Sequence, residues 1–212
     1  ALPPASQGRV AAAALKSGKH VFLEKPVSAG LTEARDLLRV AERSRSAHVV
    51  DFEFPENPLW DRARRALCAG RIGRLRHIDV RWDIETYACQ HGLNDTWKTD
   101  PAAGGGALNL FASHTLHYLE WFAGPIRTIG CRLLRAPDQT SGADTLATLD
   151  GTYASGAAYT ARVSIQSYAG TGHRIALYGG KGTIILDNPT SDYIDGFTLK
   201  IQQIGRAHVW NS

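Results

Sequence analysis

The chain has 212 residues, of which 43% are hydrophobic and 21% are charged, with a formal net charge of +4. These values are typical of a globular protein with one or two domains, and the basic residues are interspersed with acidic ones, which disfavours a nucleic-acid-binding surface. No apolar run approaches the roughly 18 residues of a membrane-spanning helix, so we expect no contact with a membrane.

The cysteine pattern indicates a reducing compartment. Cys68, Cys89 and Cys131 are far apart and odd in number. This favours free thiols over a disulfide framework or a zinc knuckle. We therefore expect a cytoplasmic protein, unless an export signal lies upstream of the printed chain.

Both ends of the chain have unusual sequences. The chain contains no methionine and opens on Leu2-Pro3-Pro4 after a single alanine, which predicts that a strand of the fold lies upstream. Residues 204–212 resemble a translated sequencing adapter. We interpret them as a non-native tail and leave them out of the predicted fold.

The first quarter of the chain alternates between helical and strand patterns. Ser6 is expected to cap a helix, and a short apolar strand follows at residues 20–23. Thr32 is expected to cap a second helix, and the apolar pair at residues 49–50 begins a second strand. This order predicts right-handed crossovers and a parallel sheet, which we assign to residues 1–54.

The second part of the chain has a different pattern. Asn57 is expected to cap a helix. Apolar and polar residues alternate over residues 78–85 and 159–166, which is typical of strands in an antiparallel sheet with one buried face. The Gly179-Gly180-Lys181-Gly182 turn joins two further strands as a hairpin. We predict an α/β fold, in which a partial parallel sheet is followed by an α+β domain at residues 55–203 with an open, mainly antiparallel sheet.

The most informative stretch is the Glu24-Lys25-Pro26 triplet, which follows the predicted strand at residues 20–23. Ligands of open α/β sheets bind at the carboxyl ends of strands, so Lys25 lies where chemistry is expected. Partial burial and a cationic neighbour lower the pKa of a lysine toward neutrality, which suits an acid–base role that Glu24 is placed to orient. The alternative is a surface lysine paired with Glu24.

A second candidate site lies after the three glycines at 104–106. Residues 107–122 are expected to form a largely buried helix, on which His114 and His117 fall on one side. No third ligand stands at a recognisable spacing, so we predict no metal site. Two alternatives stay open: polar groups that face a cleft, or structural histidines whose hydrogen bonds are satisfied within the fold.

The triplet after a strand, the three glycines and the histidine that follows them together resemble the signature of the Gfo/Idh/MocA family. These are nicotinamide-dependent oxidoreductases of sugars, cyclitols and related polyols. The resemblance covers residues 1 to about 203 and implies that the parallel sheet is the carboxyl-terminal part of a Rossmann-like domain. It also implies NAD or NADP as cofactor, a carbohydrate-like substrate and a homo-oligomer formed through the second sheet. The GxGxxG loop of such domains does not occur in this chain and would lie upstream.

The resemblance also implies roles for individual residues. Lys25 would lie between nicotinamide and substrate as the first acid–base candidate, and His114 would be the second. The cofactor-binding residues are expected to be Pro3, Pro4, Glu24, Lys25 and Pro26. The substrate-binding residues are expected to be Trp97, Lys98, Asn109, His114 and His117.

Two positions depart from the family pattern. The family often carries an aspartate four residues before the histidine, where this chain has Leu110, and Gln7 stands where a histidine is usual. Without that carboxylate, His114 lacks its usual partner. Three hypotheses therefore stay open: a dehydrogenase of a sugar, cyclitol or polyol, a non-catalytic cofactor- or sugar-binding relative, and a lyase or glycosidase that uses nicotinamide transiently. The chain by itself is expected to be inactive and poorly stable, because its parallel sheet would expose an edge.

Overall fold

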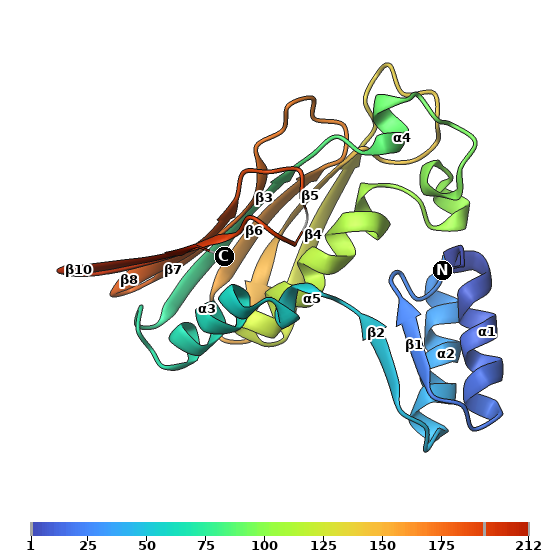
Figure 1. The fold of residues 1–212 in the computed structure, drawn as a ribbon, viewed down its shortest axis with the longest axis horizontal. Coiled ribbons are helices and arrows are strands. Elements are labelled where there is room, and N and C mark those ends of the chain that lie inside the picture. The colour runs from blue at the N-terminus through green and yellow to red at the C-terminus, as the bar shows by residue number, and fades with distance from the viewer. Residues whose placement is uncertain (1, 193, 212) are drawn as a thin grey trace.

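The structure is a computed structural model that describes residues 2–192 and 194–211. It confirms the predicted α/β class. A small parallel sheet with two helices is followed by a large, mostly antiparallel sheet that carries helices along one face (Figure 1). Within the described residues, no helix combines the length and the apolar character needed to cross a bilayer.

The first unit consists of α1 (Pro4–Lys16), β1 (Val21–Glu24), α2 (Leu31–Arg43) and β2 (His48–Asp51). The two strands pair in parallel, and their last paired residues are Glu24 and Asp51. Alternate strand residues point to the same side of a sheet, so one face of β1 packs on both helices. That small core contains Ala11, Leu15 and Leu37, with Val21 and Leu23 against it. Both strands therefore end at the same edge of the sheet.

Both helices of the first unit begin earlier than we predicted. The N-cap of α1 is Pro3 and not Ser6, because a proline in the first turn already has a helical φ and needs no N–H partner. Ser6 lies within the helix, where its hydroxyl donates to the Pro3 carbonyl at 3.1 Å. The N-cap of α2 is Gly30 in an extended conformation, which leaves Thr32 inside the first turn without a capping role.

The large sheet has eight strands in the order β10-β9-β8-β7-β3-β6-β5-β4. Their bounds are β3 (Leu75–Asp83), β4 (Ile126–Leu134), β5 (Leu146–Tyr153), β6 (Ala158–Ser164), β7 (Gly172–Gly179), β8 (Gly182–Asn188), β9 (Thr198–Gln203) and β10 (Arg206–Asn211). The central strand β3 pairs in antiparallel fashion with β7 but in parallel with β6, and every other neighbouring pair is antiparallel. The predicted hairpin is confirmed as β7 and β8.

Residues 206–211, which belong to the segment we interpreted as a tail, form β10 at one edge of this sheet. They pair with β9 in a regular antiparallel register. Pairing along an edge strand uses backbone groups and requires no particular side chains. The segment therefore extends the sheet by one strand, and Trp210 packs against the border of the core.

Helices and short turns connect and cover the large sheet. Their bounds are η1 (Phe54–Glu56), α3 (Pro58–Cys68), α4 (Tyr87–Gln90), η2 (Trp97–Thr99), η3 (Pro101–Ala103), η4 (Leu108–Ala112) and α5 (Ser113–Ala123). Asn57 is confirmed as the N-cap of α3, because its side chain accepts a hydrogen bond from the Leu59 N–H at 2.9 Å. α3 and α5 lie along one face of the sheet (Figure 1).

The helix predicted over residues 107–122 is present, but its first part is a π-helical turn, η4, which runs directly into the α-helix α5. Asp144 accounts for the start of this segment. Its carbonyl accepts from the Ala107 N–H at 2.9 Å and its carboxylate accepts from the Leu108 N–H at 2.8 Å, so a distant loop satisfies donors at the head of the helix. A π turn widens the helix, and such turns are frequent at functional sites.

The main core lies between the large sheet and α3 and α5. The predicted alternation is confirmed, since Ile78, Val80 and Trp82 of β3 are all buried. Several aromatic rings pack together within this core, and each such side chain buries on the order of 150–250 Å². The aromatic residues in contact with one another include Phe54, Trp60, Trp82, Tyr118, His173 and Phe197. This rigid cluster supports one wall of the cavity described next.

Candidate active site

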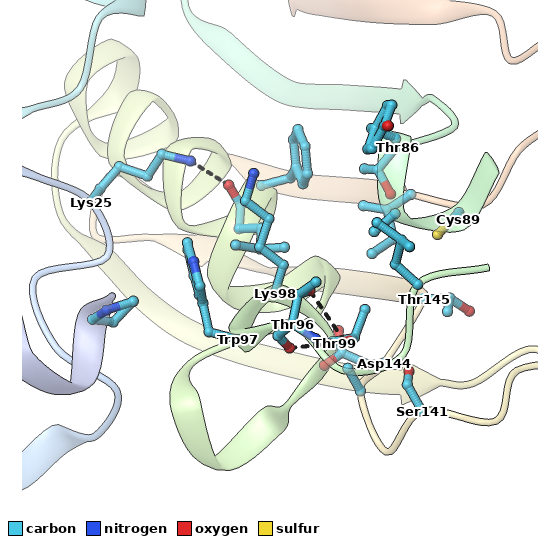
Figure 2. Close-up of a pocket in the computed structure, with 18 of the residues that line it drawn as sticks. Lys25, Thr86, Cys89, Thr96, Trp97, Lys98, Thr99, Ser141, Asp144 and Thr145 are labelled. Atoms are coloured by element: carbon cyan, nitrogen blue, oxygen red, sulfur yellow. Dashed lines mark hydrogen bonds between the residues drawn. The ribbon is translucent and has the colours of Figure 1, made fainter. Parts of the chain in front are cut away.

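A cavity of about 630 Å³ lies between the first unit and the large sheet. The first unit contributes the start of α1, the end of β1 and the residue that follows β1. The large-sheet domain contributes the loop after β3, the η2 and η4 turns and the loop before β5. Figure 2 shows the side chains of Lys25, Trp97 and Lys98 reaching into the same space from these different segments.

Lys25 directly follows β1 and points into this cavity (Figure 2). Its ammonium donates a hydrogen bond to the Leu110 carbonyl at 2.6 Å and lies 5.6 Å from the centre of the Phe111 ring. Burial lowers the pKa of Lys25 from its ordinary value of 10.5, and nearby carboxylates, Glu53 first among them, oppose this shift without reversing it. The lysine is therefore half-buried and aimed at η4, and it is not the surface lysine of the alternative interpretation.

Two side chains hold the triplet in place. The Glu24 carboxylate accepts from the backbone N–H of Lys25 at 3.1 Å, so it fixes the chain at this point and is not bonded to the ammonium. Gln7 is buried in α1, and its amide donates to the Glu24 carbonyl at 2.9 Å and to the Pro26 carbonyl. Gln7, which we noted only as a departure from the family pattern, thus ties α1 to both flanks of Lys25.

His114 opens on the same cavity from the first turn of α5. Only 3% of the residue is exposed, and the Phe52 and Phe54 rings pack against it in T-shaped geometry. Burial lowers the pKa of His114 from 6.5 to about 2, and the nearby Lys25 ammonium adds to this effect. The imidazole is therefore neutral at neutral pH.

Glu53 is a cavity residue that we did not predict. It stands two residues after β2, whereas Lys25 directly follows β1, and its Oε2 lies 3.6 Å from Nδ1 of His114. Burial raises the pKa of Glu53 above its ordinary value of 4.5, and its own backbone N–H and Lys25 oppose this shift. A signal was present in the sequence, because a carboxylate soon after an apolar strand reaches the same sheet edge as Lys25.

The cavity brings together some of the predicted residues and not others. Those that line it are Pro4, Glu24, Lys25, Trp97, Lys98 and His114. Asn109 lies outside the lining because its amide turns back to the Gly105 carbonyl, at 3.4 Å. His117 also lies outside it, stacked on Phe52 with ring centres 4.1 Å apart.

The two remaining prolines have structural positions. Pro3 is the N-cap of α1, and Pro26 follows Lys25 through a cis peptide bond and receives the Gln7 amide on its carbonyl. Neither residue belongs to the cavity lining.

Hydroxyl-bearing side chains line the wall formed by the large-sheet domain. They come from three separate loops and turns and include Thr86, Thr96, Thr99, Ser141 and Thr145. Aromatic surfaces of Trp82, Tyr87, Trp97 and Phe111 lie among them. Loop residues of this kind carry no periodic signal, so no pattern in the sequence distinguished them. Within the described part of the chain, no group of three or more His, Cys, Asp or Glu residues is arranged to hold a metal ion.

The three glycines at 104–106 close one corner of this wall. A Cβ atom on Gly105 would collide with the Lys98 carbonyl, and one on Gly106 would collide with the Asp144 carboxylate. Gly104 packs against Pro4 of α1. The glycines therefore allow three distant segments to come together at the cavity, because a side chain at Gly105 or Gly106 would collide with one of them.

Comparisons with known proteins agree with this geometry. Residues 1–52 match a family described as an oxidoreductase family with an NAD-binding Rossmann fold, and residues 60–185 match the GFO/IDH/MocA C-terminal domain. An uncharacterized oxidoreductase of Synechocystis is 30% identical over 97% of this chain and 58% of its own length. A levoglucosan dehydrogenase of Pseudarthrobacter phenanthrenivorans is 25% identical over 71% of this chain and 40% of its own length.

Solved structures have the same fold. A levoglucosan dehydrogenase in complex with NADH and levoglucosan superposes with a TM-score of 0.88 at 19% identity, over 100% of this chain and 60% of that one. An inositol dehydrogenase homolog of Azotobacter vinelandii, in complex with NAD⁺, has a TM-score of 0.85 at 20% identity, over 100% of this chain and 55% of that one. The chain thus spans little more than half the length of these proteins.

These matches confirm the predicted family, and the NAD-binding description confirms the predicted class of cofactor at the level of the family. The carboxyl ends of β1 and β2 open on the cavity, as the fold requires of a dinucleotide domain. The chain belongs to the Gfo/Idh/MocA family of oxidoreductases: residues 1–52 match part of its NAD-binding Rossmann fold, and residues 60–185 match its C-terminal domain.

Proposed function

We propose that the protein to which this chain belongs transfers hydride between NAD or NADP and a hydroxyl-bearing carbon of a sugar, cyclitol or related polyol. The observation that carries this proposal is the convergence of Lys25 and His114 on one cavity at the carboxyl end of β1. Relatives named levoglucosan dehydrogenase and D-xylose dehydrogenase support a carbohydrate-like substrate.

The cofactor side of the cavity is the end of β1. Pro4, Glu24 and Lys25 are the lining residues there, and we assign them to the nicotinamide half of the cofactor. When bound, the nicotinamide supplies a hydride acceptor or donor. Lys25 and its backbone, held by Glu24 and Gln7, then form a fixed border between cofactor and substrate.

Oxidation of an alcohol requires that a proton leave the hydroxyl while hydride leaves its carbon. Lys25 in its neutral form accepts that proton, and burial favours the neutral form because it lowers the lysine pKa. In the reverse direction the ammonium returns the proton to the carbonyl oxygen. His114, which is neutral and lines the same cavity from α5, is a second acceptor.

The substrate side of the cavity suits a ring with several hydroxyl groups. Trp97 and Phe111 offer flat apolar surfaces, and the threonine and serine hydroxyls offer donors and acceptors around them. Binding sites commonly combine an apolar lining with a few placed polar groups. Lys98, whose ammonium lies 5.9 Å from the Trp97 ring centre, adds a further donor near this surface.

The experiment is a substrate screen of the protein produced from its full open reading frame. A panel of sugars, cyclitols and linear polyols is tested with NAD⁺ and with NADP⁺, and formation of the reduced nicotinamide is followed by absorbance. We expect turnover of at least one polyol. Cofactor binding by calorimetry without turnover of any member would support the non-catalytic alternative, which Leu110 favours, and would refute the proposed dehydrogenase.

We also propose that the protein is a homo-oligomer whose copies meet through the face of the large sheet that α3 and α5 leave uncovered. His77, Arg81, Thr160 and Arg162 are exposed on strands at the centre of that sheet. Light scattering of the full-length protein is expected to give a multiple of the monomer mass. A monomeric mass at micromolar concentration would contradict this proposal.

A further inference from the structure

His114 has an unusual environment for a buried histidine. Its Nδ1 atom is buried and has no hydrogen-bond partner among the described residues. The neighbouring Phe52 and Phe54 rings stand nearly perpendicular to the imidazole, at 90° and 81°, and offer only their edges or faces. Buried polar atoms are normally hydrogen-bonded, so a polar group that a small movement would bring to Nδ1 is a candidate partner for it.

Glu53 is the group that faces this atom. Its Oε2 lies 3.6 Å from Nδ1, which is longer than a hydrogen bond but within reach of a modest side-chain rotation. Catalytic hydrogen bonds are often long before substrate binds and tighten in the complex. Glu53 also lines the cavity, so a ligand that enters it meets both groups.

The helical turn that precedes His114 carries no carboxylate that could bond to the imidazole. Position 110 is a buried leucine, and its carbonyl is already used by the Lys25 ammonium. Glu53 instead comes from the segment after β2. Because β1 and β2 are paired in parallel up to Glu24 and Asp51, the residues that follow both strands arrive at one sheet edge.

We propose that Glu53 is a positioning residue that accepts a hydrogen bond from Nδ1–H of His114 and thereby leaves Nε2 unprotonated on the cavity side. This inference rests on the proposed function, since it assigns the second acid–base group of that reaction. The partner bonded to one imidazole nitrogen decides which tautomer the ring adopts. A neutral imidazole held in this way accepts a proton only at Nε2.

When His114 is the acceptor, the proton moves from the substrate hydroxyl to Nε2 of the imidazole. The O–H bond of the substrate hydroxyl breaks, an N–H bond forms at Nε2, and the ring becomes an imidazolium whose charge the Glu53 carboxylate offsets. The same proton returns to the oxygen in the reverse reaction. An adjacent carboxylate is needed because burial otherwise disfavours the charged ring.

Other charged or titratable groups also influence this pair. Those that act on His114 are Lys25, His117 and His173, and those that act on Glu53 are Lys25, Asp51 and Glu24. Burial raises the pKa of Glu53, so this carboxyl loses its proton at a higher pH than an ordinary glutamate. An acidic limb in the pH profile of kcat is therefore expected, with activity rising as Glu53 loses its proton.

The kinetic test compares Glu53→Gln, which keeps the shape and removes the charge, with the control Glu56→Gln at an exposed carboxylate three residues away. In the full-length enzyme we expect Glu53→Gln to lower kcat by about 10²-fold, with little change in KM. We also expect it to lose the part of the acidic limb that belongs to Glu53 and to keep the part that belongs to Lys25. Glu53→Asp is expected to restore part of the rate and the limb. Wild-type kcat and an unchanged pH profile in Glu53→Gln would overturn the inference.

A second test does not depend on turnover. Nitrogen NMR of the histidine side chains distinguishes protonated from unprotonated ring nitrogens, and His114→Gln identifies the signals of His114. We expect Nδ1–H in the wild-type protein and a loss of that preference in Glu53→Leu, which offers no acceptor. An unchanged His114 tautomer in Glu53→Leu would refute the role of Glu53 even in an active enzyme. An inactive wild type with the expected tautomer would refute only the proposed function.

Discussion

Lys25 shows how a single side chain can be placed by neighbours that the local sequence does not reveal. Its position at the end of β1 follows from a short apolar run. Its direction follows from the Leu110 carbonyl, 85 residues away, and from Gln7, whose amide holds both flanking carbonyls. A lysine directed in this way loses rotational freedom before substrate arrives, which favours proton transfer in a fixed geometry.

Replacing Lys25 by methionine keeps the apolar stem and removes the amine. We expect kcat of the full-length enzyme to fall by about 10²–10⁴-fold. In the wild type, alcohol oxidation should rise with pH through the lowered pKa of Lys25, because only the neutral amine accepts a proton. Steady-state kinetics over a pH series measures both effects, with Lys16→Met on the exposed side of α1 as control. An unchanged rate in Lys25→Met would remove Lys25 from the site.

At the scale of elements, the glycine turn and η4 decide how the cavity is closed. The turn brings η2, α1 and the loop before β5 together, and Asp144 then satisfies the first donors of η4. The apolar residues of 107–122 predicted the helix here but not the π-helical turn in its first part. Periodicity reports which residues are buried, but it does not report which backbone groups a distant loop will bond.

Substitution of Gly106 tests this closure. Gly106 and Gly124 both have a left-handed φ, 99° and 81°, but only Gly106 has a side chain against the position of a Cβ atom. Gly124→Ala is expected to cost about 1–3 kcal/mol of unfolding free energy from backbone strain alone. Gly106→Ala is expected to cost a further ~1–3 kcal/mol from the collision with Asp144. Denaturant titration of both variants measures the difference, and equal losses would contradict a steric role for Asp144.

The whole molecule buries two histidines beside its aromatic core and thereby links its stability to pH. Burial lowers the pKa of His114 to about 2 and that of His173 to about 3, below the ordinary value of 6.5. The Tyr118 hydroxyl lies 3.0 Å from Nε2 of His173, while the His173 ring stacks on Trp82. Both imidazoles are therefore neutral in the folded protein at pH values where an unfolded chain would protonate them.

These two histidines make the folded state less stable in acid. Below pH 6.5 the unfolded state binds more protons than the native state, so the free energy of unfolding falls as the pH falls. Each histidine contributes a slope that approaches ~1.4 kcal/mol per pH unit. Glu53, whose pKa is raised above its ordinary value of 4.5, acts in the opposite sense in the acidic range and offsets part of this slope. The contribution of a histidine is therefore obtained from the difference between the wild type and a histidine variant between about pH 5 and 7.

Denaturant titrations at several pH values measure the slope. His173→Gln is expected to lower the slope by up to ~1.4 kcal/mol per pH unit, whatever its effect on stability at neutral pH. His114 and His117, whose pKa values are also lowered by burial, continue to contribute in this variant. Retention of the full slope in this variant would show that His173 is protonated to the same extent in the folded and unfolded states.

Much of the fold and part of the site could be predicted from local sequence. Alternation of apolar and polar residues predicted the strands at residues 78–85 and 159–166, because one buried face imposes a period of two. The apolar run before Glu24-Lys25-Pro26 and the three glycines before His114 predicted the two segments that meet in the cavity. The parallel pairing of β3 with β6 was not predicted, since alternation is the same in either direction.

The sequence by itself determined which side chains stand at the ends of strands and which faces are buried, because these depend on short-range periodicity. Only the tertiary structure decided that Lys25 bonds to the Leu110 carbonyl, that Gln7 holds the triplet, and that Glu53 reaches His114. These contacts join residues far apart in the chain or cross the boundary between the two units. They depend on how whole elements pack against one another. That packing is the result of many weak contacts between distant residues, which a local sequence pattern does not predict.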